Sequence, residues 1–189
     1  MIICWNVNSI YSRFNHLTEL IREHNPKVIL LQEIKCIEEK FPYEELSDLG
    51  YNIKVFGQKA YNGVAILSKY PLDDTIIGLE GMGDNQEARY IENTIVIEKI
   101  CYKIISVYVP NGSEVGSEKF VYKLNFFQKL YERLAYLMKY EENIIIGGDL
   151  NVAPEAIDVY DPKRSDGKLL FNIEERRCFR KLLNLGLID

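Results

Sequence analysis

The chain has 189 residues, of which 47% are hydrophobic and 27% are charged, and its formal net charge at pH 7 is −5. This composition is ordinary for a globular protein, and one domain of this length can bury roughly 70% of the surface that its unfolded chain exposes. No apolar run approaches the roughly 20 residues that cross a bilayer, which excludes a membrane-spanning helix, and the acidic balance argues mildly against a nucleic-acid partner. The start of the chain lacks a signal-peptide pattern, and four scattered cysteines without a CxxC pair predict reduced thiols in a cytoplasmic protein.

Short apolar or alternating runs bounded by turn residues predict the strands. In chain order we expect strands at residues 2–6, 28–32, 51–56, 64–68, 90–97, 102–109 and 144–148. Apolar residues at helical spacing predict helices at residues 12–24 and 119–140, with a short helix between Pro42 and Gly50 and a last helix from near Ile173. The pattern mixes βαβ units with consecutive strands, which predicts a single α/β domain of two sheets packed face to face with helices outside.

Capping residues support two of these helices. Ser117 is expected to cap the long helix at its N-terminus, and Asn172 with Glu175 forms a capping box for the last one. A loop of about twenty residues separates the strand at 144–148 from that last helix, and it is long enough to suggest a functional role.

Acids and amides follow three of the predicted strands. The strand at 144–148 ends in glycines and is followed by Asp149 and Asn151, while Glu33 follows the second strand and Asn6 ends the first. Open α/β architectures place ligand sites at the carboxyl ends of their strands. Carboxylate and amide oxygens without a nearby thiolate or imidazole suit a hard cation such as Mg²⁺. These residues therefore predict metal-assisted phosphate chemistry.

Positive charge gathers in one segment of this acidic chain. Residues 161–181 carry seven lysines and arginines against four aspartates and glutamates. Charge alone favours a solvated loop and helix face, but the segment also suits an enzyme that binds and releases DNA.

Six short motifs occur along the chain in a familiar order and spacing. They are residues 5–10 (WNVNSI), 31–35 (LQEIK), 57–59 (GQK), 62–68 (NGVAILS), 108–112 (YVPNG) and 148–151 (GDLN). Together they resemble the exonuclease III and apurinic/apyrimidinic endonuclease branch of the endonuclease/exonuclease/phosphatase superfamily, over essentially the whole chain. The GDxN motif alone is not specific, whereas the QExK motif with the GQK loop favours the DNA-repair branch over lipid and inositol phosphatases.

The resemblance implies a four-layer αββα sandwich and Mg²⁺-dependent hydrolysis of DNA phosphodiesters, with Mn²⁺ as an alternative metal. The partner would be double-stranded DNA with abasic sites or 3′ ends. Carried over by position, the residues would act as follows: Glu33 and Asn6 at the metal, Asp149 at the attacking water, Asn151 and Tyr108 at the scissile phosphate, and Arg89 and Lys123 at the DNA backbone.

Each assignment at the strand ends has a structural alternative. Glu33 could be a solvated acid at a strand end, and Asp149 with Asn151 could be turn residues after two glycines. The convergence of these residues with Asn6 favours the functional interpretation. Asn8 could serve as a capping residue, and its role stays open.

The remaining assignments have alternatives too. Tyr108 could be an ordinary sheet residue, and only the motif around it favours a functional role. Arg89 could form a surface ion pair with Glu87 or Glu92, a contact of small energy. Lys123 is more typical of a solvated helix residue.

The sequence also departs from the family pattern. Family members continue with strands that carry an Asn-x-Gly-x-Arg-x-Asp motif and a Ser-Asp-His motif, which are absent here, so we expect the sandwich to be incomplete at its C-terminus. The two histidines, His16 and His24, lie on the first predicted helix. Lys27 and Tyr11 replace an acid and an arginine of the family.

Three functions remain open at this point. The first is an exonuclease III-type DNA-repair nuclease whose activity is weakened by truncation, because groups that act as a unit lose most of their effect together. The second is a catalytically inactive DNA-binding or interaction remnant. The third is a phosphoesterase of the same superfamily that acts on a substrate other than nucleic acid.

Overall fold

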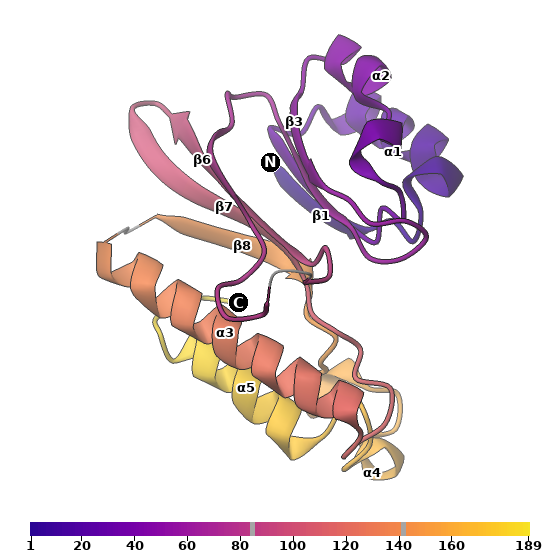
Figure 1. Ribbon diagram of the computed structural model, residues 1–189, viewed down its shortest axis with the longest axis vertical. Coiled ribbons are helices and arrows are strands. Elements are labelled where there is room, and N and C mark those ends of the chain that lie inside the picture. The colour runs from indigo at the N-terminus through magenta and orange to yellow at the C-terminus, as the bar shows by residue number, and fades with distance from the viewer. Residues whose placement is uncertain (84–85, 141–142) are drawn as a thin grey trace. The chain divides into compact units, whose positions relative to one another are not determined.

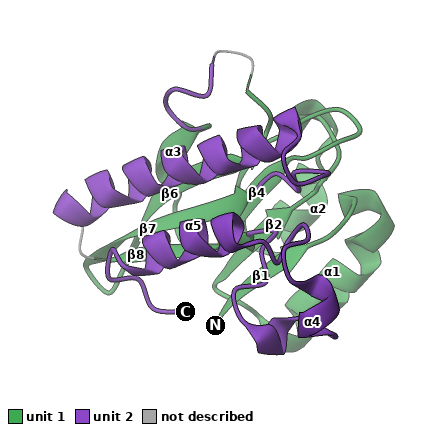
Figure 2. Cartoon of the chain, turned by 90° about the horizontal axis from the view of Figure 1, so that it is seen from below, with its two compact units in different colours: residues 1–78, 84–108, 143–149 green, residues 79–83, 109–142, 150–189 purple. Residues whose placement is uncertain are grey.

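A computed structural model describes residues 1–83, 86–140 and 143–189. The chain forms two compact units, which Figure 2 colours separately. The first comprises residues 1–78, 84–108 and 143–149, and the second comprises residues 79–83, 109–142 and 150–189. Within the described residues no helix is long and apolar enough to cross a membrane, and the four cysteines are free thiols.

One sheet of the first unit has the strand order β1 (Ile2–Asn6), β2 (Val28–Gln32), β4 (Val64–Ser68) and β3 (Asn52–Phe56). β1 runs parallel to β2, and the other neighbours are antiparallel. Every residue of the central strands β2 and β4 is buried. Burial on both faces explains why these strands read as continuous apolar runs in the sequence.

The other sheet of this unit has the strand order β5 (Asp73–Ile77), β6 (Tyr90–Ile97), β7 (Ile100–Tyr108) and β8 (Ile144–Asp149). Here β7 and β8 are parallel, and Tyr108 pairs with Asp149 at their carboxyl ends. β5 was not predicted, because all its residues are exposed and it lacks the apolar alternation that marks a half-buried strand.

The two sheets pack face to face, as the sequence predicted (Figure 1). Their shared core takes alternate residues of four strands, namely Val28, Leu30, Val64, Ile66, Ile91, Ile95 and Ile104. Helices α1 (Ile10–His24) and α2 (Tyr43–Asp48) cover the opposite face of the first sheet through a second apolar cluster that includes Leu17, Leu46 and Leu31. A short 3₁₀ turn, Glu38–Lys40, precedes α2.

The second unit is built around helices α3 (Glu118–Tyr140) and α5 (Ile173–Leu183), which pack against each other. The loop expected before α5 contains a 3₁₀ turn, Ala156–Asp158, and the short helix α4 (Pro162–Ser165). Both predicted caps are confirmed: the Phe120 N–H donates to Ser117 Oγ at 3.2 Å, and Asn172 and Glu175 form a capping box.

Some predicted boundaries move by one or two residues. α1 begins at Ile10 rather than residue 12, because Ser9 accepts a hydrogen bond from the Ser12 N–H and caps the helix earlier. β7 starts two residues earlier than predicted and ends at Tyr108, just before Val109 and Pro110. Proline has no N–H with which to continue the ladder.

Candidate active site at the strand ends

Asn6 holds two carboxylates together at the ends of three strands. Its side-chain nitrogen donates to Glu33 Oε1 at 2.8 Å and to Asp149 Oδ2 at 2.9 Å. Asn6 ends β1 and pairs in register with Gln32, the last residue of β2, while Asp149 ends β8 of the other sheet. Asn6, Glu33 and Asp149 therefore converge as predicted, and all three lie within the first unit.

The chain leaves β2 in an unusual backbone conformation. Glu33 and Lys35 have φ angles of 51° and 54°, in the left-handed region that L residues seldom adopt. The turn lets Lys35 Nζ reach back to Glu33 Oε2 at 2.9 Å and to Asn8 Oδ1. Lys35 is not among the site residues predicted from the sequence, although it belongs to the QExK motif, and Asn8, whose role stayed open there, accepts a hydrogen bond from it.

Two adjacent glycines allow β8 to enter the site. A Cβ on Gly148 would lie 2.0 Å from the Val107 carbonyl oxygen, and one on Gly147 would lie 2.7 Å from Leu30 Cδ1. Side chains at these positions would force β8 away from β7 and from the first sheet. The Gly-Gly-Asp sequence therefore places Asp149 by permitting close approach of the backbone.

Tyr108 joins the cluster from the end of β7. It hydrogen-bonds the Glu33 carboxylate. Burial, followed by the hydrogen bond and the negative charge of Glu33, raises the pKa of Tyr108 to about 12. The hydroxyl consequently stays protonated at neutral pH and can act as a hydrogen-bond donor.

Arg89 lies against Tyr108. Its guanidinium carbon is 4.6 Å from the centre of the tyrosine ring, and Nη1 donates to the Tyr108 carbonyl at 3.3 Å. Nε also pairs with Glu87 at 2.5 Å, so one of the ion pairs offered as a structural alternative is formed. Glu92, the other partner considered, accepts a hydrogen bond from the Tyr90 hydroxyl at 2.6 Å.

The environment of Glu33 favours its ionised form. Partial burial by itself would raise the pKa of Glu33, but hydrogen bonds from Asn6, Lys35 and Tyr108 and the charge of Lys35 outweigh it, so the pKa is lowered from its ordinary value of 4.5. Glu33 is therefore a carboxylate at neutral pH, available to a cation.

Asn151 and Lys123 belong to the second unit. Asn151 follows Asp149 by two residues, has a φ of 47°, and donates from Nδ2 to the Val109 carbonyl at 2.8 Å. The Lys123 side chain is fully buried and ion-paired with Glu175, which is also fully buried. A buried, paired ammonium is not presented to a DNA backbone, so the structure does not support the DNA contact predicted for Lys123.

Sequence reasoning recognised Glu175 only as a capping residue. Its carboxylate does accept from the Asn172 N–H at 3.1 Å, as the capping box requires. The pairing with Lys123 joins residues 52 positions apart. Nothing in the sequence around either residue predicts that the two are partners.

The oxygen atoms of the strand-end cluster fit a hard divalent cation. Among the described residues, no three or more His, Cys, Asp or Glu side chains form a metal-binding group. Mg²⁺, however, is commonly held by one or two carboxylates and keeps several waters, a requirement that Glu33 and Asp149 meet. The Asn6 oxygen accepts the Asn8 N–H at 3.1 Å, so in this arrangement Asn6 organises the two carboxylates.

Neither histidine joins this cluster in the part of the chain that the structure describes. His16 and His24 both lie on α1, and His24 lies 3.8 Å from Glu23. The site assembled by the described residues thus contains carboxylates, amides, a phenol and positively charged lysine and arginine side chains, without an imidazole.

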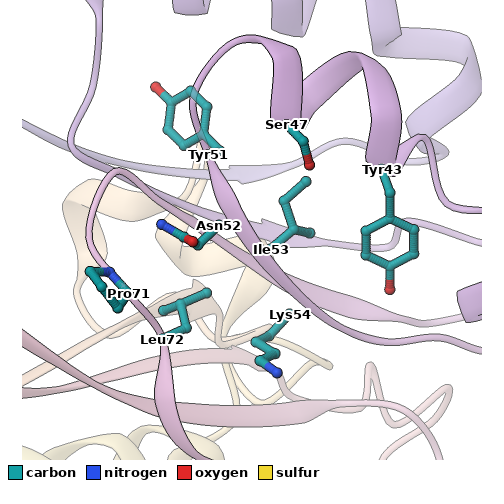
Figure 3. A pocket seen from close by; sticks show the side chains of 8 residues that line it. All are labelled: Tyr43, Ser47, Tyr51, Asn52, Ile53, Lys54, Pro71 and Leu72. Carbon is teal, nitrogen blue, oxygen red and sulfur yellow. The ribbon is translucent and has the colours of Figure 1, made fainter.

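A groove of about 420 Å³ lies elsewhere in the first unit, between α2, β3 and the turn before β5 (Figure 3). Asn52, in its lining, pairs with Ser68, and Ser68 pairs with Val28 at the start of β2. The groove therefore lies at the opposite end of the first sheet from Glu33, and it does not include the candidate site.

Residues 3–185 match the model of the endonuclease/exonuclease/phosphatase family. The chain belongs to this family. It is 34% identical to exodeoxyribonuclease III of Haemophilus influenzae and 30% identical to an exodeoxyribonuclease of Bacillus subtilis. These alignments cover 99% and 100% of this chain and 73% of each relative.

Solved structures of family members share the fold. A 3′–5′ exonuclease from Neisseria meningitidis superimposes with a TM-score of 0.92 at 36% identity, over 99% of this chain and 72% of that one. An AP endonuclease from Archaeoglobus fulgidus gives a TM-score of 0.89 at 35% identity, over 100% of this chain and 72% of that one. The predicted fold class is therefore confirmed.

Proposed function

We propose that the chain is a DNA-repair nuclease of the exonuclease III type, a Mg²⁺-dependent phosphodiesterase that incises DNA at abasic sites and acts on 3′ ends. One observation carries the proposal: the Asn6 amide bridges the carboxylates of Glu33 and Asp149 at the carboxyl ends of three strands. The relatives named above, two exodeoxyribonucleases and an AP endonuclease, support DNA as the substrate.

The charges of the cluster support hydrolysis of a phosphodiester. Two carboxylates lie within hydrogen-bonding distance of one amide, and such closely spaced like charges favour a bound cation. A divalent metal supplies charge relief on the phosphate oxygens when it is bound. Glu33 and Asp149 would hold it, with Asn6 fixing both carboxylates.

The other side chains have distinct roles in this proposal. Asp149 orients the attacking water and accepts its proton, as a carboxylate in hydrogen-bonding reach can. Tyr108, kept protonated by its high pKa, donates to a phosphate oxygen. Asn151 donates a further hydrogen bond where negative charge develops. Arg89 holds the DNA backbone beside Tyr108, to which it is already fixed.

The basic segment supplies a surface for DNA. Lys163, Arg164 and Lys168 are exposed in the second unit, and so is Tyr160, which precedes them in the sequence. Phosphate contacts from such residues would make binding sensitive to salt.

Turnover should be slow, because the site assembled by the described residues has no imidazole and groups that act as a unit are strongly non-additive. The test is incision of a duplex with one abasic site by the 189-residue chain, with Mg²⁺, with Mn²⁺ and with EDTA. Glu33→Ala should abolish the metal-dependent incision. Glu132→Ala is the matched control, since Glu132 is a surface acid paired with Lys129 on α3.

The same assay distinguishes the proposed nuclease from a second candidate function, DNA binding without cleavage, which the basic segment favours. Folded protein that binds duplex DNA in a salt-sensitive manner and leaves it intact would support that function. Release of phosphate from inositol phosphates, with no effect on DNA, would instead identify a phosphoesterase for another substrate.

A further inference from the structure

A buried ammonium, that of Lys123, lies in the interior of the second unit. Lys123 Nζ contacts the Glu175 carboxylate, the Asn111 carbonyl at 3.1 Å and the Asn151 carbonyl at 2.6 Å. Both charged side chains are fully shielded from solvent. These three acceptors are enough for the three N–H donors of an ammonium, so this charge is both paired and hydrogen-bonded.

Glu175 is fixed as firmly as its partner. Its carboxylate accepts hydrogen bonds from the Leu170 N–H at 3.2 Å and from the Asn172 N–H at 3.1 Å. These bonds tie it to the start of α5, so the position of the Lys123 head group is set by the fold.

The two carbonyls that Lys123 joins belong to the segments that follow β7 and β8. Tyr108 ends β7, Asp149 ends β8, and the two residues are partners in the parallel ladder. Just beyond them, Asn151 Nδ2 donates to the Val109 carbonyl at 2.8 Å, and Asn111 Nδ2 donates to Asn151 Oδ1 at 3.4 Å. The ammonium therefore adds a third link between the two segments.

Gly112 shows how closely the chain wraps this lysine. Its φ is 95°, and a Cβ there would lie 3.0 Å from Lys123 Cδ. Only glycine adopts this conformation readily, and the contact holds the lysine stem beneath the segment that follows β7.

We propose that Lys123 is a positioning residue, which together with Glu175 fixes the main chain at Asn111 and Asn151 and thereby sets the direction of the Asn151 side chain. The inference rests on the proposed function, in which Asn151 donates to the scissile phosphate. It replaces the DNA contact suggested by sequence.

The variant that isolates this role is Lys123→Met with Glu175→Gln. It removes both charges together, and the change at Glu175 should preserve the helix cap, because glutamine also suits a capping box. Lys129→Met is the matched control, since Lys129 lies on the same helix and pairs with Glu132 at the surface.

The readouts are kcat and KM on abasic duplex, the salt dependence of DNA binding, and hydrogen exchange of residues 109–112 and 150–152. We expect kcat to fall about tenfold to a hundredfold, since small misplacements of catalytic groups have effects of this size. KM and the salt slope should stay as in the unaltered chain, and exchange should quicken in the two segments only.

Three outcomes would overturn the proposal: faster exchange in these segments with unchanged kcat, reduced kcat with unchanged exchange, or a salt slope reduced by about one, the mark of a lost phosphate contact. If the double variant does not fold, Lys123→Arg, which keeps Glu175 paired, is judged by the same criteria. If the unaltered chain cleaves no DNA, the proposed function fails, whereas the exchange measurement still decides whether Lys123 fixes the two segments.

Discussion

Two glutamates, each paired with a lysine, occupy contrasting environments in this chain. The Glu33 and Lys35 side chains keep 19% and 29% of their surface exposed, whereas those of Glu175 and Lys123 keep none. Glu33 shares the Asn6 amide with a second carboxylate, that of Asp149. Glu175 instead accepts backbone N–H groups at the start of a helix.

The two environments differ in how fully the charges and hydrogen-bonding groups of each glutamate and its neighbours are already satisfied. Around Glu175 the carboxylate is paired with an ammonium, and that ammonium has at least three hydrogen-bond acceptors. Around Glu33, two carboxylates approach one amide and remain partly open to solvent, so a cation can still be added. In our proposals, the same pair of residue types therefore serves metal binding where it is partly exposed and positioning where it is fully buried.

The largest effect is expected on DNA incision, from a change in the open cluster, which comprises Asn6, Glu33 and Asp149. Asp149→Asn keeps the shape of the side chain but removes the carboxylate that we propose accepts a proton from water. Incision should fall by about a hundredfold, the lower end of what a positioned general base contributes, because losses within a catalytic unit that already lacks an imidazole are not additive. Single-turnover assays on abasic duplex measure it, and activity within tenfold of the unaltered chain would rule out Asp149 as the base.

The closed cluster, which comprises Lys123 and Glu175, should contribute more to the free energy of unfolding than the pair of Lys35 and Glu33 does. Lys123→Met leaves Glu175 charged and buried, at a cost of about 3–5 kcal/mol. Lys35→Met removes a partly exposed partner and should cost no more than about 1 kcal/mol. Urea unfolding of both variants gives the comparison. Equal losses would mean that the two pairs do not differ in the way their burial indicates.

How much of this could be read from the sequence depends on the range of the interaction. Glu33, Asp149 and Asn6 were predicted because each ends or follows an apolar strand, and strand ends meet at one edge of a sheet. Asn172 and Glu175 were recognised as a cap because capping boxes are local. Tyr108 came only from the motif resemblance, since a tyrosine in a strand carries no signal of its own.

Long-range pairing could not be read in the same way. Lys123 looks like any lysine on a long helix, and its burial depends on Glu175, which lies 52 residues further along the chain. The left-handed turn that brings Lys35 back to Glu33 could not be predicted from the sequence either. Glycine and asparagine are the residue types that signal such a turn, and neither Glu33 nor Lys35 is one of them. β5 was missed because its residues are exposed and do not alternate.

Metal binding offers a third, smaller test of the open cluster. Mg²⁺ at ten times its dissociation constant should add about 1.4 kcal/mol to the free energy of unfolding, provided that it binds only the folded chain. Glu33→Gln should remove this increment, and Glu175→Gln should leave it intact. Thermal unfolding with and without Mg²⁺ measures both, and an increment that survives Glu33→Gln would place the metal elsewhere.

The smallest effect is a pH dependence carried by Glu33. Its pKa in the folded chain lies below the ordinary value of 4.5, because hydrogen bonds from Asn6, Lys35 and Tyr108 outweigh the opposing effect of burial. A lowered folded-state pKa contributes stability that is fully present above the unfolded pKa and is lost as the pH falls through the folded one. The difference in unfolding free energy between the unaltered chain and Glu33→Gln should therefore be constant near neutral pH and shrink below 4.5. Urea titrations from pH 7 downward, without metal, follow this difference. A gap that widens on acidification would show that the open cluster does not favour the ionised carboxylate, and the contrast with the closed cluster would then lose its electrostatic basis.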